Sequence, residues 1–213
     1  MIPGAVANGF KEKDLNLVIA LACQEELSRH GVSVKMSRTK DDSESNTEKV
    51  KECNNFAPNL ALDIHNNAGG GDGAEVFHHY KGGTSKTLAN NILAEVVAIG
   101  QNSRGAKIKT NASGKDAFVF IRETAAPAVI VECAFIDSKD VQIIDTRGEQ
   151  AAMGVAIAKG VLKTLGIAYK AEQPVSKGKT YRVQVGAYSV KENATAMLSK
   201  LKKAGFDGYI KED

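Results

Sequence analysis

Apolar residues recur along this chain with two different spacings, which predict helices and strands in turn. Apolar positions repeat every three or four residues in three stretches, which predicts amphipathic helices over 12–30, 84–99 and 147–165. A further helix is expected over 45–55, because Ser45 and Glu48 have the spacing of a capping box. The helix over 147–165 also carries three glycines that suit close packing on a neighbour, Gly148, Gly154 and Gly160.

Shorter apolar runs predict strands between these helices. The runs are 32–36, 60–65, 74–78, 118–121 and 128–131. The last run is continuous and β-branched, which is typical of a strand buried on both faces. Residues 101–116 are polar and irregular, so we expect a long loop there that serves as a substrate rim. Because strands and helices alternate, the sequence predicts a three-layer α/β domain with a mostly parallel sheet.

The pattern changes near the C-terminus. Residues 168–179 contain lysines, a proline and a glycine with little apolar content, which predicts a linker. This linker would separate a first domain over 1–167 from a small unit over 180–213. In that unit a strand is expected over 181–185, a helix over 189–204 and a last strand from Tyr209. Such a βαβ unit is shorter than the roughly 40 residues that usually fold alone.

Composition places the chain among ordinary soluble globular proteins, with 43% hydrophobic and 25% charged residues. No run approaches the ~18 apolar residues that cross a bilayer, so no membrane insertion is expected. The N-terminus lacks the basic and apolar regions of a signal peptide, so we expect synthesis in the cytoplasm. Three cysteines, Cys23, Cys53 and Cys133, lie far apart without a CxxC motif, which favours reduced core thiols.

The net charge of +3 is unevenly distributed. Residues 170–213 carry nine Lys or Arg and five Asp or Glu, a balance of +4, and residues 1–169 carry nineteen against twenty, a balance of −1. A basic C-terminal unit suits an anionic surface. The balance of +4 is too small to indicate a nucleic-acid partner. The sequence also lacks a basic stripe interleaved with aromatic residues, which such a partner would require.

Three residues at the ends of predicted elements are candidates for chemistry. Glu12 opens the first helix, His65 ends one strand, and Glu132 follows the β-branched run. Each has a structural explanation when taken alone, such as the helix dipole for Glu12. Together, one imidazole and one carboxylate suit zinc with an open position for water. A second carboxylate that does not bind the metal can then act as a general base.

The same residues lie within stretches that resemble a known family. Residues 8–17, 37–38, 63–68 and 127–136 resemble the zinc-dependent N-acetylmuramoyl-L-alanine amidases of bacterial cell-wall lysis, found in phage endolysins and in sporulation and autolytic enzymes. The resemblance runs in order from about Pro3 to Leu165. Residues 181–188, Tyr-Arg-Val-Gln-Val-Gly-Ala-Tyr, resemble the sporulation-related (SPOR) repeat, a peptidoglycan-binding module.

The resemblance implies a cofactor, a reaction and a partner. It places Glu12 and His65 at two ligand positions for Zn²⁺ and Glu132 at the catalytic glutamate. The implied reaction is hydrolysis of the amide between the lactyl group of N-acetylmuramic acid and L-alanine of the stem peptide. Asn67 and Arg122 are candidate substrate-binding residues. Peptidoglycan is the implied partner, which an enzyme without a signal peptide would reach after release from the cell.

Two departures from the family leave alternatives open. In the family, a strand ending in a Gly-His-Gly-Gly turn supplies a third zinc ligand, and we expect this chain to start just after that turn. The remaining histidines, His30, His78 and His79, do not match a ligand position. The alternative is therefore a catalytically inactive peptidoglycan-binding protein, and a third reading is a zinc peptidase of different specificity. SPOR domains usually contain two βαβ repeats and this chain has one, so we predict a homodimer through residues 180–213.

Overall fold

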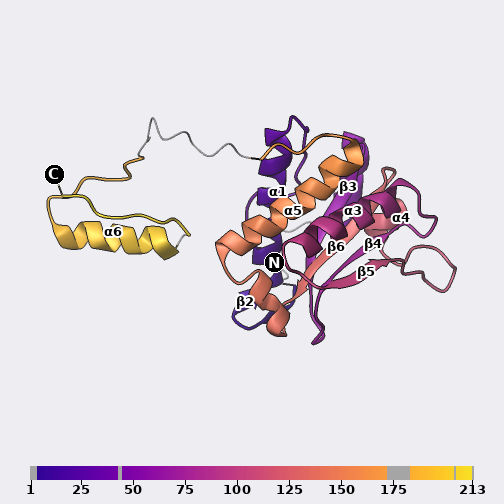
Figure 1. Cartoon of the computed structure of the whole chain (residues 1–213), viewed down its shortest axis with the longest axis horizontal. Helices are drawn as coiled ribbons and strands as arrows, with labels where there is room; N and C mark the ends of the chain where they lie inside the picture. The colour runs from indigo at the N-terminus through magenta and orange to yellow at the C-terminus, as the bar shows by residue number, and fades with distance from the viewer. Residues whose placement is uncertain (1–3, 43–44, 172–182, 204, 213) are drawn as a thin grey trace. The chain divides into compact units, whose positions relative to one another are not determined.

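The computed structural model describes residues 4–42, 45–171, 183–203 and 205–212. It divides into two compact units, residues 1–170 and 171–213 (Figure 1). The domain boundaries at 167 and 180 stay a prediction, because most of the expected linker lies outside the described residues. Within the described ranges, no helix combines the length and apolar character that a membrane span requires.

The first unit is built on a sheet of four strands. Their order is β3 (Ala61–Asn67), β6 (Ala128–Phe135), β4 (Ala74–His78) and β5 (Ser103–Lys107). Strand β6 runs parallel to β3 and antiparallel to β4, and β4 runs parallel to β5. The predicted mostly parallel sheet is therefore confirmed.

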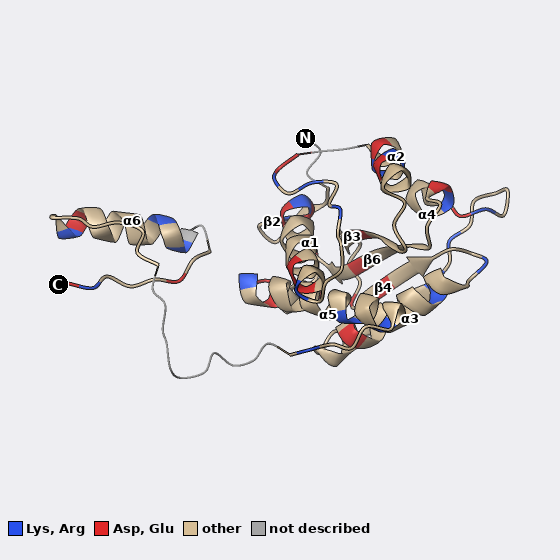
Figure 2. Cartoon of the chain, turned by 90° about the horizontal axis from the view of Figure 1, so that it is seen from above, with Lys and Arg blue, Asp and Glu red and all other residues tan. Residues whose placement is uncertain are grey.

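Helices cover both faces of this sheet (Figure 2). One face carries α1 (Glu12–Arg29), α3 (Thr84–Ala98) and α5 (Arg147–Leu165), and the other carries α2 (Asn46–Phe56) and α4 (Val119–Glu123). The three-layer α/β architecture is confirmed, as are the four long helices. Ser45 caps α2 through the predicted capping box, and Thr146 and Glu149 form a second box at α5.

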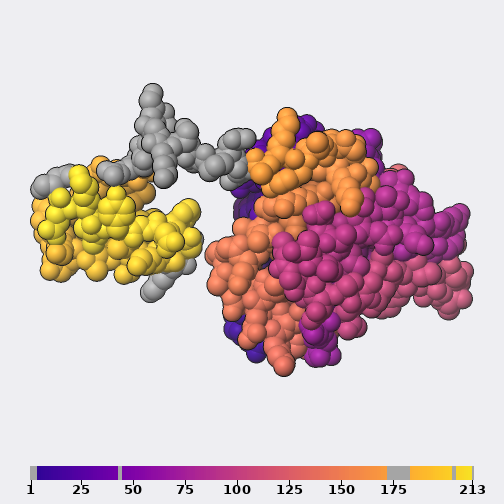
Figure 3. Space-filling model, viewed as in Figure 1, coloured from indigo at the N-terminus to yellow at the C-terminus, as the bar shows by residue number. Residues whose placement is uncertain are grey.

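Helix α5 packs between α1 and α3, and it lies beside α3 on the face seen in Figure 3. The contacts are close at two glycines. A Cβ on Gly154 would overlap the carbonyl oxygen of Ile19, and one on Gly160 would overlap the backbone of Ile92. The prediction of close packing is thus confirmed at these two positions, whereas Gly148 has no close neighbour on another helix.

Side chains of β6 alternate between the two layers, as expected for a strand buried on both faces. Val129, Val131 and Cys133 lie in the main core with α1, α3 and α5. Ala128 and Ile130 belong to a smaller cluster with α2 and α4. Alternation therefore puts Glu132 on the same face of the sheet as this smaller cluster.

The strand predicted over 118–121 is wrong. Residues Val119–Glu123 form the short helix α4, and Phe120 and Ile121 pack on Val50 of α2 and on β6. A run of four apolar residues does not reveal whether the apolar period is that of a helix or of a strand.

The long loop predicted over 101–116 is wrong in part, because Ser103–Lys107 forms β5. This strand lies at the sheet edge, and within the described part of the chain it pairs with β4 alone. Its pairing register shifts between Ala74 and Val76, and Gly105 there has a φ of +93° that favours glycine. A polar edge strand of this kind lacks the apolar alternation that identifies strands in a sequence.

The strand predicted over 32–36 is also wrong, since the structure assigns no strand there. Val32 and Val34 do pack against the core, which explains their alternation. However, a cavity of about 400 Å³ is lined by residues 32–38 and by residues 60–65 of the β3 segment. Among the described residues, segment 32–36 therefore has no neighbouring strand with which to exchange hydrogen bonds.

In the small unit, helix α6 (Lys191–Lys203) confirms the predicted helix. The described residues on either side, 183–190 and 205–212, form no strand ladder. Val183 and Tyr209 in these segments are 92% and 70% exposed. Strands that flank one helix in a split βαβ unit need other strands between or beside them, and the described residues of this unit provide none.

Candidate active site

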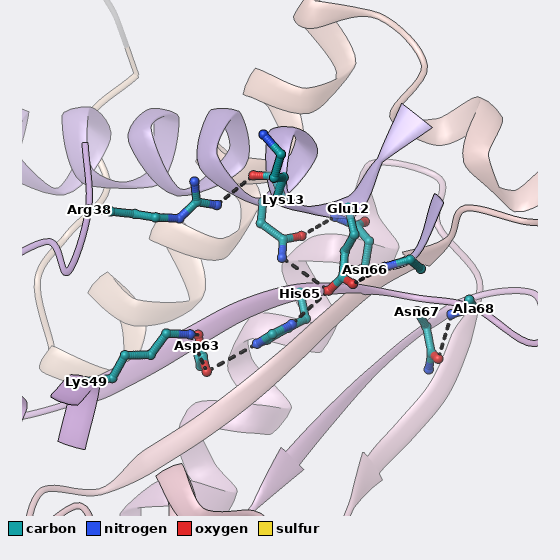
Figure 4. A network of polar contacts seen from close by, with 11 residues as sticks. Glu12, Lys13, Arg38, Lys49, Asp63, His65, Asn66, Asn67 and Ala68 are labelled. Atoms are coloured by element: carbon teal, nitrogen blue, oxygen red, sulfur yellow. Dashed lines mark hydrogen bonds and ion pairs between the residues drawn. The ribbon is translucent and has the colours of Figure 1, made fainter. Parts of the chain in front are cut away.

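Three predicted residues meet at one end of β3 and β6. His65 and Glu132 are direct neighbours in the parallel pair, so their side chains lie on one face of the sheet. Glu12 is the first residue of α1, and its Oε1 lies 2.8 Å from Nδ1 of His65 (Figure 4). The structure therefore brings Glu12, His65 and Glu132 together from three separate segments of the chain.

The position of Glu12 is fixed by its neighbours. The backbone N–H of Ala5 donates to Oε2 at 3.0 Å, and Asn16 Nδ2 donates to Oε1 at 3.2 Å. Gly4 has a φ of +68°, and a Cβ there would overlap Oε2 of Glu12. Burial opposes ionisation, but the hydrogen bonds with His65 and Ala5 lower the pKa of Glu12. Glu12 is thus an ionised carboxylate held at a helix N-terminus, where the dipole also favours it.

The imidazole of His65 lies between two carboxylates. Its Nε2 is 3.2 Å from Oδ2 of Asp63, opposite the contact with Glu12. Asp63 is held in turn by Nζ of Lys49, at 3.1 and 3.3 Å from its two oxygens. Burial opposes the charged imidazolium, but hydrogen bonds with Asp63 and Glu12 raise the pKa of His65 to about 10. The ring is therefore fixed in orientation, with Asp63 holding one nitrogen as carboxylates commonly do for metal-binding histidines.

Sequence reasoning assigned no role to Asp63 or Lys49. A signal was available for Asp63, because it precedes His65 by two residues on a strand and so shares its face. No comparable signal identified Lys49, since its contact with Asp63 depends on how α2 packs on the sheet.

Glu132 differs from Glu12 because its carboxylate is not satisfied. Its Oε2 is buried and has no hydrogen-bond partner among the described residues. Burial raises the pKa of Glu132 to about 7; the charge of His65 lowers it, whereas those of Glu12 and Glu75 raise it further. A carboxyl group with this pKa can both accept and release a proton near neutral pH.

Comparison with known protein families places this geometry in context. The profile that describes N-acetylmuramoyl-L-alanine amidases matches residues 2–163. The chain belongs to the N-acetylmuramoyl-L-alanine amidase family. The profile of the SPOR domain matches residues 157–212, so both resemblances seen in the sequence are confirmed.

Individual relatives agree with this assignment. The sporulation-specific N-acetylmuramoyl-L-alanine amidase of Bacillus subtilis (strain 168) is 34% identical over 213 residues, covering 98% of this chain and 79% of the relative. Among solved structures, Cwp6 from Clostridium difficile is 35% identical with a TM-score of 0.75, over 76% of this chain and 27% of that chain. The catalytic domain of CwlV, an N-acetylmuramoyl-L-alanine amidase from Bacillus (Paenibacillus) polymyxa var. colistinus, is 26% identical with a TM-score of 0.70, over 78% and 92% of the two chains.

The two candidate substrate-binding residues of this amidase family member lie in different places. Asn67 ends β3, and its Nδ2 donates to Oε1 of Glu75 at 3.1 Å, beside the site. Arg122 lies in α4, where its Nη1 donates to the backbone oxygens of Asp116 and Ala117 at 2.8 and 3.3 Å. It lines a second cavity that includes none of Glu12, His65 and Glu132. The structure therefore does not bring Arg122 to the candidate active site, and its contacts hold the loop before α4.

The donors fit the zinc ion that this amidase family implies, but only in part. A carboxylate and an imidazole in contact, Glu12 and His65, are suitable zinc ligands, whereas catalytic zinc usually takes three protein ligands. No group of three or more His, Cys, Asp or Glu able to hold a metal is found among residues of the described ranges. The other histidines are bonded elsewhere: His30 to Glu26, His78 to the backbone of His79, and His79 to Asp116.

Proposed function

We propose that this chain hydrolyses the amide bond between the lactyl group of N-acetylmuramic acid and L-alanine of the peptidoglycan stem peptide. Membership of the amidase family supports the reaction class. The observation that carries the proposal is the buried Oε2 of Glu132, which has no hydrogen-bond partner within the described ranges; Glu132 is the direct neighbour of His65 in the sheet. A desolvated carboxylate without a partner is costly to maintain unless it has a chemical role.

In this proposal Glu12 and His65 are two ligands of Zn²⁺, and Asp63 keeps the imidazole oriented. Bound zinc would acidify a water molecule and polarise the scissile carbonyl. Glu132 accepts the proton of the attacking water as its oxygen bonds to the lactyl carbonyl carbon. Glu132 then passes that proton to the alanine nitrogen as the C–N bond breaks. Because Glu132 is not a ligand here, it remains available for both transfers.

One observation favours a second candidate, a catalytically inactive peptidoglycan-binding protein. The described residues supply two donors for a metal ion where a catalytic zinc site usually has three. Such a protein would keep the fold and the SPOR match without turnover. Zinc content after purification without added metal separates the two candidates, with about one ion per chain expected for the enzyme.

Digestion of purified peptidoglycan tests the proposed reaction. Cleavage at the lactyl amide releases peptides with new alanine N-termini and leaves the glycan strands intact. We therefore expect free alanine amino groups to appear without new reducing sugar ends, as measured by amino-group labelling and a reducing-sugar assay. New reducing ends, or N-termini other than alanine, would contradict the assignment.

Removal of residues 171–213 is expected to weaken binding to intact cell walls while leaving turnover of soluble muropeptides within about twofold. The SPOR match and the basic charge of this part of the chain support a role in binding peptidoglycan. Co-sedimentation with insoluble walls and hydrolysis of soluble fragments measure the two effects separately. An equal loss of both would show that residues 171–213 support the catalytic unit instead.

The homodimer through residues 180–213 also remains a proposal. The exposed Val183, Val185, Phe206 and Tyr209 would gain a buried environment if two copies of the unit paired. Light scattering at high protein concentration should give twice the mass of the 22.6 kDa chain. A monomer under these conditions would count against pairing.

A further inference from the structure

A row of charged side chains crosses the sheet next to the candidate active site. Glu75 of β4 is the direct antiparallel neighbour of Glu132, just as His65 is its parallel neighbour. Directly paired residues project to the same face of a sheet. His65, Glu132 and Glu75 therefore follow one another across three adjacent strands, and β5 comes next.

Two cations from β5 bind Glu75. The side chain of Glu75 is only 8% exposed, and its Oε2 accepts hydrogen bonds from Nε of Arg104, at 3.0 Å, and from Nζ of Lys107. Asn67 donates to the other oxygen, Oε1. The guanidinium of Arg104 also lies over the ring of Phe135, 4.9 Å from its centroid. Glu75 is thus a buried anchor that fixes the position of both cations.

The cations themselves remain accessible. The side chains of Arg104 and Lys107 are 38% and 35% exposed. Two positive charges share one carboxylate, so this cluster has a net charge of +1. A guanidinium and an ammonium together also have more N–H donors than Glu75 can accept from. The cluster therefore has charge and donors available for an anionic ligand.

We propose that Arg104 and Lys107 are specificity-determining residues that bind a carboxylate of the stem peptide on the leaving-group side of the cleaved amide. This inference rests on the proposed amidase function. Neighbouring strands are about 4.8 Å apart, so β5 lies about 10 Å across the sheet from Glu132. An extended peptide advances about 3.3 to 3.6 Å per residue, so a carboxylate on the second or third stem residue spans that distance.

The cations at the candidate active site are already bound to carboxylates. His65 lies between Glu12 and Asp63. Lys49 is bound to both oxygens of Asp63. Arg104 and Lys107 are the cations that adjoin the row on its other side.

Two substrates that differ in one group test the proposal. They are a muramoyl peptide whose second residue carries a free carboxylate and the same peptide with that group amidated. For Lys107→Gln we expect KM for the acidic peptide to rise about tenfold with kcat little changed, and KM for the amidated peptide to stay the same. Lys107→Arg keeps the charge and should restore most of the loss. Lys109→Gln is the matched control, because Lys109 lies over the ring of Phe118 rather than on Glu75.

The outcomes separate this subsite from the proposed function. Turnover of either peptide by the unaltered chain supports the amidase, and only the ratio of the two KM values reports on the subsite. If no turnover is seen, the amidase proposal fails. The subsite is then tested by the ratio of the dissociation constants of the two peptides, measured with labelled peptides. An equal effect of Lys107→Gln on both peptides, or no effect on either, would overturn the subsite and leave Arg104 and Lys107 with a structural role.

Discussion

Replacing Glu132 by glutamine is expected to reduce hydrolysis of peptidoglycan by about a thousandfold, because the amide cannot accept the proton of the attacking water. The same change should leave zinc content unaltered, since Glu132 is not one of the proposed ligands. Stability should be unchanged or higher, because a buried amide costs less than a buried carboxylate whose Oε2 has no partner among the described residues. Dye release from labelled cell walls, metal analysis and thermal melting measure the three quantities.

A matched control for this variant is Glu123→Gln. Glu123 is an exposed glutamate that pairs with Arg122, away from the candidate active site. We expect its replacement to leave hydrolysis within about twofold of the unaltered chain. If Glu132→Gln keeps appreciable activity while folding normally, Glu132 is not the general base.

Replacing His65 by alanine should abolish both zinc binding and hydrolysis. The change removes one of the two donors that Glu12 and His65 provide, and it leaves the carboxylates of Glu12 and Asp63 facing each other without the cation between them. We expect zinc affinity to fall by at least about a hundredfold. Metal content after dialysis and the release of alanine N-termini from cell walls measure the two losses.

The control for this variant is His79→Ala. His79 is also a histidine beside a carboxylate, with Nε2 3.2 Å from Oδ2 of Asp116, but it contacts neither Glu12 nor Glu132. Zinc content should be the same with and without this substitution. An unchanged zinc content in His65→Ala would remove His65 from the list of ligands, whatever happened to hydrolysis.

Local patterns in the sequence determined much of the fold. The four long helices follow from apolar spacing and from the capping box at Ser45, which depend only on residues a few positions apart. The buried strand β6 follows from a run of β-branched residues that few other structures accommodate. Glu12 opens a helix, and His65 and Glu132 follow apolar runs, so all three could be singled out as candidates before the structure placed them together. The expectation that the last two of these residues end their strands is wrong, since β3 continues to Asn67 and β6 to Phe135.

Tertiary structure alone decided the elements and contacts that depend on distant partners. Residues 119–123 form a helix because α2 and β6 bury Phe120 and Ile121. Residues 103–107 form the strand β5 because they pair with the backbone of β4. The alternating segment 32–36 is not a strand because a cavity, rather than a strand, adjoins it.

The environment of the site was determined in the same way. The strand order β3-β6-β4-β5 sets Glu75 beside Glu132 and brings Arg104 and Lys107 to Glu75, although no spacing in the sequence connects them. Sequence therefore identified groups suited to the chemistry, since these adjoin the apolar runs from which helices and strands could be predicted. Their charges, hydrogen bonds and accessible neighbours come from backbone pairing between distant segments, which sequence periodicity does not encode.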